Sequence, residues 1–213
     1  ARPLPQHILK TRQALIFSII IGASGIGVLW FHVNHSAALW TLGTLLGYGL
    51  IYTALLKRAT PQNIVIGGLS GALPPLLGWV CVNPSLGPEP WLLVLIIFAW
   101  TPPHFWALAI ARIDEYAQTQ LPMMPITHGI QYTKIQIMLY TGLLISATGL
   151  PYAIGMFSWP YLLGSQLLNA RFVYWTWALY KSKCPKVAYQ TFFFSIKYLC
   201  ALFVLMVLDH VFF

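Results

Sequence analysis

The sequence predicts an all-α integral membrane protein, a bundle of seven spanning helices in a single domain. Only 8% of the 213 residues are charged and 58% are hydrophobic, whereas an ordinary soluble domain is about a quarter charged. The apolar residues also form continuous runs of about 20, the length that crosses a bilayer, without the period-two alternation of a β-barrel. A soluble globule, a disordered chain and a collagen-like chain are therefore excluded.

The seven predicted helices follow one another through short connections, except for a longer polar connection after the fourth. Proline pairs inside the third and fourth helices should kink them, and small residues four positions apart should allow close helix contacts. The helices are Ala14–Val33, Ala37–Leu56, Ile64–Val82, Trp91–Ala111, Ile135–Phe157, Trp159–Tyr180 and Phe192–Phe213. The proline pairs are Pro74-Pro75 and Pro102-Pro103, and the glycine pairs are Gly43/Gly47 and Gly67/Gly71.

Basic residues predict the orientation of the bundle. Lys and Arg precede the first helix and lie in the second, fourth and sixth connections, while the other three connections have none. The positive-inside rule then places the N-terminus and the three basic connections in the cytoplasm. Five tryptophans lie at the opposite helix ends, as an interfacial belt requires. They are Trp30, Trp40, Trp79, Trp91 and Trp159.

The charges and cysteines exclude two other kinds of site. The net charge of +8 is spread in small groups between apolar runs, which suits membrane topology and not a nucleic-acid partner. The three cysteines have no CxxC spacing, so neither a disulfide framework nor a zinc site is expected.

Two of the four acidic residues are adjacent in the longest connection. Asp114 and Glu115 follow Arg112 close to the predicted membrane surface. Magnesium typically binds one or two carboxylates together with substrate phosphates, so this cluster predicts a magnesium site for a diphosphate. The alternative is a solvated loop with a local salt bridge.

Other polar residues near the predicted helices have two interpretations each. Lys57 and Arg58 precede Thr60-Pro61 at a helix start, which favours an anion or phosphate site; a basic pair at a membrane edge is the alternative. His104 is an ionisable group inside a predicted span, hence a functional candidate, and a packing histidine is its alternative.

Two further cations lie inside predicted spans. Arg171 is ten residues before Lys181, about 15 Å along a helix, which indicates a position near the middle of the membrane. It needs a partner or a polar cavity there. Lys197 is close enough to the helix end to extend to the interface, and we interpret it as structural.

Three stretches together resemble the protohaem IX farnesyltransferases, a group within the UbiA-like intramembrane prenyltransferases. They extend over nearly the whole chain and combine several long motifs. They read Tyr52-Thr…Leu56-Lys-Arg…Thr60-Pro-Gln-Asn63…Gly67-Gly…Gly71-Ala…Pro74-Pro…Gly78-Trp79, then Trp100-x-Pro-Pro-His-Phe…Arg112…Glu115-Tyr116…Pro122-Met…Pro125, and finally Phe194-Ser-Ile-x-Tyr-Leu199…Leu202-Phe203…Asp209-His210.

The resemblance implies a nine-helix fold with two acidic motifs on the cytoplasmic side of a bacterial inner membrane. The first motif of the family precedes an Arg-Pro-Leu-Pro sequence, which stands here at Arg2–Pro5. The seven predicted helices then correspond to the third to ninth, and residues 1–213 form one transmembrane domain without two helices and the first acidic motif. We therefore expect half a magnesium site and no activity from these residues alone. Glu115 stands where the family has Asp or Glu, and Asp114 is at a more variable position.

The implied reaction joins the farnesyl group of farnesyl diphosphate to a vinyl group of haem b, which gives haem O for haem–copper terminal oxidases. Asp114 and Glu115 would hold magnesium as catalytic residues. The cations expected at the diphosphate are Lys57, Arg58, Arg112 and Arg2, of which the first two are also catalytic candidates. Haem or prenyl contacts are expected from His104, Asn63, Tyr52, Phe105, Trp106 and Tyr116. Membrane lipid and a haem A synthase or terminal-oxidase assembly are the other implied partners.

Three alternatives stay open on the sequence. Another UbiA-type enzyme would use a different aromatic acceptor. A seven-helix receptor or retinal protein would explain the helix count and a lysine in the last helix, but no acid in the third helix could act as counter-ion. A transporter would explain the broken helices, although the acidic pair then lies in a surface connection and not at the midplane.

Overall fold

The computed structural model describes residues 10–56, 59–83, 85–118 and 122–213, and these residues form helices without any strand. The all-α prediction is therefore confirmed for the described part. In chain order the elements are α1 (Thr11–His32), α2 (His35–Leu46), the π-helical η1 (Gly47–Leu56), α4 (Asn63–Ala72), α5 (Pro74–Val82), α6 (Glu89–Ala111), α7 (Ile113–Ala117), α8 (Met124–Thr127), α9 (Ile130–Ala153), α10 (Trp159–Lys181) and α11 (Pro185–Phe212).

Five helical stretches of the described chain are long and apolar enough to cross a membrane, which makes this an integral membrane protein. They are Thr11–His32, Asn63–Val82, Glu89–Ala111, Ile130–Ala153 and Pro185–Phe212. The predicted second and sixth spans are helical, as α2 with η1 and as α10, but they are not among the five. In α10 the reason is composition, since Gln166, Asn169 and Arg171 interrupt its apolar sequence.

Two helices begin well before their predicted first residues, by five and seven positions. Helix α9 starts at Ile130 instead of Ile135, directly after Gly129, whose φ of 84° lies in the region that glycine adopts without strain. Helix α11 starts at Pro185 instead of Phe192. A hydropathy window detects the hydrocarbon layer, whereas a helix continues into water because its backbone hydrogen bonds are internal. The polar turns of both helices were therefore missed.

The two proline pairs act differently. Only Leu73 separates the end of α4 from Pro74, which starts α5, so the predicted third helix is two helices. Proline fits the first turn of a helix, where its missing N–H has no partner to lose. Pro102 and Pro103 stay inside the continuous α6, where both are buried by neighbouring helices.

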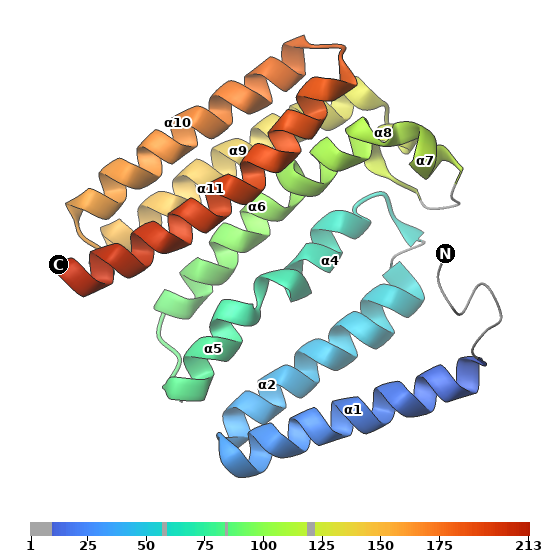
Figure 1. Ribbon diagram of the computed structural model, residues 1–213, viewed down its shortest axis with the longest axis vertical. Coiled ribbons are helices and arrows are strands. Elements are labelled where there is room, and N and C mark those ends of the chain that lie inside the picture. Colours follow the sequence, from blue (N-terminus) through green and yellow to red (C-terminus); the bar gives the residue numbers. More distant parts are fainter. Residues whose placement is uncertain (1–9, 57–58, 84, 119–121) are drawn as a thin grey trace.

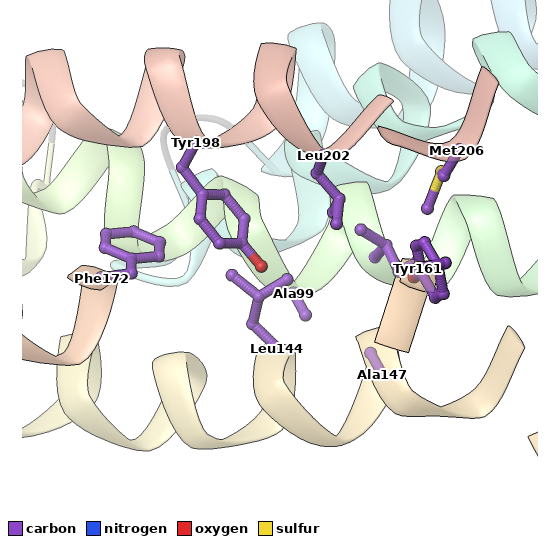
Figure 2. Close-up of a cluster of buried hydrophobic side chains, with 9 residues drawn as sticks. Ala99, Leu144, Ala147, Tyr161, Phe172, Tyr198, Leu202 and Met206 are labelled. Atoms are coloured by element: carbon purple, nitrogen blue, oxygen red, sulfur yellow. The ribbon is translucent and has the colours of Figure 1, made fainter. Parts of the chain in front are cut away.

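Helix α6 occupies the centre of the structure (Figure 1). It packs against α4 and α5 on one side and against α9 and α11 on the other, while α10 covers α9 and α11. Figure 2 shows the core between α6, α9, α10 and α11, where Tyr198 and Leu202 of α11 point toward Leu144 of α9 and Ala99 of α6. Between apolar helices in lipid, such packing is itself a main source of association.

Polar side chains link the same helices inside the apolar core. The Asn169 side chain donates to Thr148 Oγ1 at 2.9 Å and accepts from the Tyr198 hydroxyl at 2.7 Å. The Tyr161 hydroxyl donates to the Thr148 carbonyl at 2.9 Å. A buried polar group without a partner is costly, so these bonds fix the register of α9, α10 and α11.

The glycine prediction is wrong at three of its four positions. A methyl group added at Gly43, Gly47 or Gly71 would meet nothing within 4 Å in the described chain, so no helix approaches there. At Gly67 it would lie 2.5 Å from the Tyr52 ring, as a close contact requires. The unpredicted Gly68 makes a close contact between α4 and α6, because a Cβ there would lie 2.8 Å from Thr101 Cγ2. Spacing alone does not show which face of a helix meets a neighbour.

Candidate functional site

A cavity of about 1330 Å³ lies between α1, α2, η1, α4 and α6, and reaches α7. It exceeds the roughly 300–1,000 Å³ of most small-molecule sites. Its wall is mostly aliphatic side chains and glycines, with a few aromatic and polar groups. Four of the predicted substrate-contact residues line it: Tyr52, Asn63, Phe105 and Tyr116.

The acidic pair lies beside one end of this cavity. Helix α7 follows α6 after a single residue, and it carries Asp114, Glu115 and the cavity-lining Tyr116 in consecutive positions. Both carboxylates are exposed. Asn63, buried at the start of α4, lines the cavity as well. An apolar chamber thus ends next to two carboxylates.

Among the described residues, Arg112 is the cation at the α7 end of the cavity. Its Nη1 lies 3.7 Å from Glu115 Oε2, and both side chains are exposed, so the pair contributes little to stability. The hydroxyl of Tyr189, from α11, and the charge of Glu115 raise the pKa of Arg112 above its ordinary value, so the guanidinium stays charged. The local salt bridge that we considered as the alternative does form, but an exposed pair can open and release both groups.

The donor set fits magnesium in part. The two adjacent carboxylates offer oxygen ligands, and substrate phosphates and water can complete the coordination. Among the described residues there is no group of three or more His, Cys, Asp or Glu side chains that could hold a metal alone. The pair therefore suits an ion that arrives with a diphosphate. Arg2, Lys57 and Arg58 lie outside the described residues.

His104 has one satisfied and one open ring nitrogen. Its Nδ1 lies 2.7 Å from Ser195 Oγ, and that hydroxyl is 2.6 Å from the Phe192 carbonyl. A carbonyl oxygen can only accept a hydrogen bond, so the Ser195 hydroxyl donates its single hydrogen bond to the Phe192 carbonyl. The Ser195 oxygen then accepts from His104 Nδ1–H, and we assign the Nδ1–H tautomer to the imidazole. Nε2 then carries a lone pair. It makes no hydrogen bond with the described residues, and it is not one of the fully buried polar atoms.

Aromatic rings hold the imidazole of His104 on two sides. It stacks on Trp100 at 4.3 Å and on Phe192 at 4.5 Å between centroids, and it meets the edge of Phe105. His104 itself does not line the cavity, although Trp100 and Phe105 do. The histidine therefore lies one side chain behind the wall, on the α11 side of α6.

Trp106 lies apart from these residues. It is completely buried, packs edge-on against Tyr140 of α9, and belongs to a cluster with Ile137 and Met124. Neighbouring residues on a helix point about 100° apart, so Phe105 reaches the cavity and Trp106 the opposite core.

The sequence interpretation missed part of the cavity wall. Trp100 was a usable signal, since tryptophan is typical of membrane interfaces and is unusual deep in a span; its Nε1 donates to the Ser195 carbonyl at 2.8 Å. Helices α1 and α2 carried no motif residue that pointed to the site. The missed wall residues include Gly22, Gly25, Thr41, Trp100 and Thr101.

Comparisons with known proteins show the family of this chain. Residues 1–197 match the UbiA prenyltransferase family. A protein named protoheme IX farnesyltransferase from Stutzerimonas stutzeri (strain A1501) is 56% identical over 209 residues, which are 98% of this chain and 70% of that protein. Proteins of the same name from Legionella pneumophila (strain Corby) and Azotobacter vinelandii are each 54% identical, over 99% and 98% of this chain and 72% and 70% of their own lengths.

A solved structure supports the fold separately. It comes from work on digeranylgeranylglyceryl phosphate synthase in membranes, and it matches with a TM-score of 0.81 over 98% of this chain and 73% of that chain. The two sequences are only 20% identical, so this likeness concerns the arrangement of helices alone.

Proposed function

The chain belongs to the UbiA prenyltransferase family, and from that membership we propose that it transfers the farnesyl group of farnesyl diphosphate to a vinyl group of haem b, giving haem O for haem–copper terminal oxidases. One observation carries the proposal: relatives named protoheme IX farnesyltransferase are 54–56% identical over nearly the whole chain. The apolar cavity beside an acidic pair is what such a substrate requires.

The cavity accommodates the farnesyl chain. Along α6 its wall extends from Ile97 to Phe105, about 12 Å at 1.5 Å per residue, and Tyr116 continues it toward α7. Apolar walls bind an isoprenoid and exclude water from its reactive end. The diphosphate then lies at the α7 end, beside Arg112.

In this proposal, cations bind the diphosphate directly and carboxylates bind it through magnesium. Arg112, Lys57, Arg58 and Arg2 pair with its oxygens, and the permanently charged Arg112 is the described member of this set. Asp114 and Glu115 are the residues that would hold magnesium. When bound, magnesium neutralises negative charge on the departing diphosphate.

Aromatic faces and the dry cavity assist the bond changes. The allylic C–O bond breaks, its electron pair leaves with the diphosphate, and positive charge develops on the prenyl carbon. Tyr52, Phe105 and Tyr116 line the cavity, and aromatic rings there stabilise a cation. The haem vinyl group then forms the new C–C bond, and water adds to the neighbouring vinyl carbon and releases one proton, which leaves a hydroxyethylfarnesyl group.

His104 positions haem in this proposal. Ser195 occupies its Nδ1, so the open Nε2 is available to a ligand on the α6–α11 side. Its stacking on Trp100 and Phe192 restricts the ring to one orientation. Trp106 supports the position of α6 from the core side.

We further propose that residues 1–213 form one transmembrane prenyltransferase domain with seven spans, the third to ninth of a nine-helix fold. The alternating basic connections favour a cytoplasmic α7 end, and the bacterial relatives favour an inner membrane. Haem b, farnesyl diphosphate and membrane lipid are then direct partners, and a haem A synthase or oxidase assembly would receive the product.

The test is product formation by the complete protein that carries this chain. Membranes containing it are incubated with haem b, farnesyl diphosphate and magnesium. The porphyrin products are then separated by chromatography, and their masses are determined by mass spectrometry. We expect a product heavier than haem b by one farnesyl group and one hydroxyl. A prenylated quinone or another aromatic product, with haem b unchanged, would show a different acceptor.

A further inference from the structure

The hairpin of α10 and α11 carries a surface that the proposed reaction does not use. Between residues 171 and 208 the sequence has five basic residues and no acid. Within the described residues the one salt bridge is Arg112–Glu115, so none of the five is paired with a carboxylate. The five are Arg171, Lys181, Lys183, Lys186 and Lys197.

Contacts between α10 and α11 show how far Arg171 and Lys197 lie from the connected end of the hairpin. Thr191 Oγ1 donates to the Trp175 carbonyl at 3.3 Å, so these residues are level. From that level Arg171 lies four residues, about 6 Å, and Lys197 six residues, about 9 Å, toward the other end of the hairpin. The continuous apolar run of α11 begins after Thr191, so we infer a membrane boundary near that level, with both cations just inside it.

The two cations flank one aromatic bridge. The Trp175 and Phe194 rings, 6.3 Å apart, connect α10 to α11. The Arg171 guanidinium lies 4.9 Å from the Tyr174 ring centroid and 5.6 Å from that of Trp175. Lys197 follows Phe194 by three positions, so it lies on the same helix face. Arg171 and Lys197 are both exposed.

We propose that this basic seam, which consists of Arg171, Lys197, Trp175 and Phe194, binds the phosphate-bearing headgroup of an anionic phospholipid. The headgroup comes from the leaflet at the connected end of the hairpin. Long cationic side chains below the boundary extend toward lipid phosphates, aromatic rings favour the interfacial layer, and clustered bases beside spanning helices recognise anionic lipids. Lys181, Lys183 and Lys186 surround the same end and favour a headgroup with more than one negative charge.

The seam is separate from the diphosphate end of the cavity. The cavity is lined by Met123 and by residues of α1, α2, η1, α4, α6 and α7, and α10 contributes none. Helix α10 contacts α9 and α11 and lies at the outer edge of the bundle, away from α1 and α2 (Figure 1). Its exposed cations therefore face the lipid and not the prenyl substrate.

The test compares lipid binding by matched variants of the complete protein. Native mass spectrometry counts retained lipids after titration with phosphatidylglycerol, cardiolipin or phosphatidylcholine. The double variant Arg171→Gln with Lys197→Gln is compared with Lys10→Gln with Arg12→Gln, which removes the same charge at the start of α1. Each cation near the membrane surface contributes about a fivefold gain in affinity for an anionic lipid. Removing two of them should therefore weaken the binding of the anionic lipids roughly thirtyfold, and only in the seam variant.

Three outcomes would overturn the proposal. Equal losses in both double variants would show a net-charge effect without a site. Unchanged binding in the seam variant would exclude the seam, and a co-purifying acidic membrane protein released by that variant would assign the surface to a protein partner. The variant Arg171→Lys with Lys197→Arg keeps the charges and should retain the lipid, which separates a lost site from a misfolded helix. The readout does not depend on prenyl transfer, so it stands apart from the proposed activity.

Discussion

The imidazole of His104 and the hydroxyl of Ser195 lie 2.7 Å apart and connect α6 to α11. This bond decides which ring nitrogen is open, since the Ser195 hydroxyl donates its only hydrogen bond to the Phe192 carbonyl. A neutral histidine with its Nδ1 occupied can bind a ligand only through Nε2. The orientation of a proposed haem contact is thus set by a residue that was not among the predicted site residues.

Replacing Ser195 by alanine should weaken haem binding selectively. The substitution leaves the buried Nδ1–H of His104 without its acceptor, at a cost of about 1–3 kcal/mol. The proton of the imidazole is then no longer held on Nδ1. We expect a higher KM for haem b with little change in the KM for farnesyl diphosphate, measured by initial rates of haem O formation. The variant Ser195→Thr retains a hydroxyl and should restore the haem KM. Equal increases in both KM values would indicate a general loss of packing instead.

Neutralising the acidic pair should remove turnover and not stability. Because Glu115 and Asp114 are exposed, Glu115→Gln should change the free energy of unfolding by no more than about 0.5 kcal/mol, while haem O formation falls to background. Asp114→Asn should raise the magnesium concentration needed for half-maximal activity. The matched control is Glu89→Gln, at the opposite end of α6, which should retain activity. Near-normal turnover by the Glu115 variant would remove that residue from the proposed site.

Filling the open side of α4 should obstruct the cavity. Gly71 lines it, and a Cβ there meets nothing within 4 Å in the described chain, so Gly71→Leu adds a side chain to the space proposed for the farnesyl tail. We expect a lower kcat/KM for farnesyl diphosphate than for the shorter geranyl diphosphate. Thermal unfolding in detergent should stay close to that of the unmodified protein. An unchanged preference between the two diphosphates would mean that the tail lies elsewhere.

The fold was more predictable than the site because the two depend on different properties. Hydropathy identified the helical runs, since crossing a bilayer demands a long apolar stretch. Helix ends such as Ile130 and Pro185 were missed because water imposes no such demand. Motif residues identified Tyr52 and Phe105 on the cavity wall, but Trp106, one position further along α6, belongs to the core. The direction of each side chain depends on neighbours that no local pattern contains.

The contact between Gly68 and Thr101 gives a stability prediction of the same kind. A Cβ at position 68 would lie 2.8 Å from Thr101 Cγ2 and 3.2 Å from its Cβ, so Gly68→Ala must push α4 away from α6. Overpacking of this size costs about 1–3 kcal/mol, and we expect a lower unfolding temperature in detergent. Thr101→Ser removes the closest methyl group and should recover part of the loss when combined with Gly68→Ala, whereas Gly43→Ala should be neutral because its surroundings are open. Additive effects of the two substitutions would contradict a direct contact, since neighbours that share a contact couple and distant sites do not.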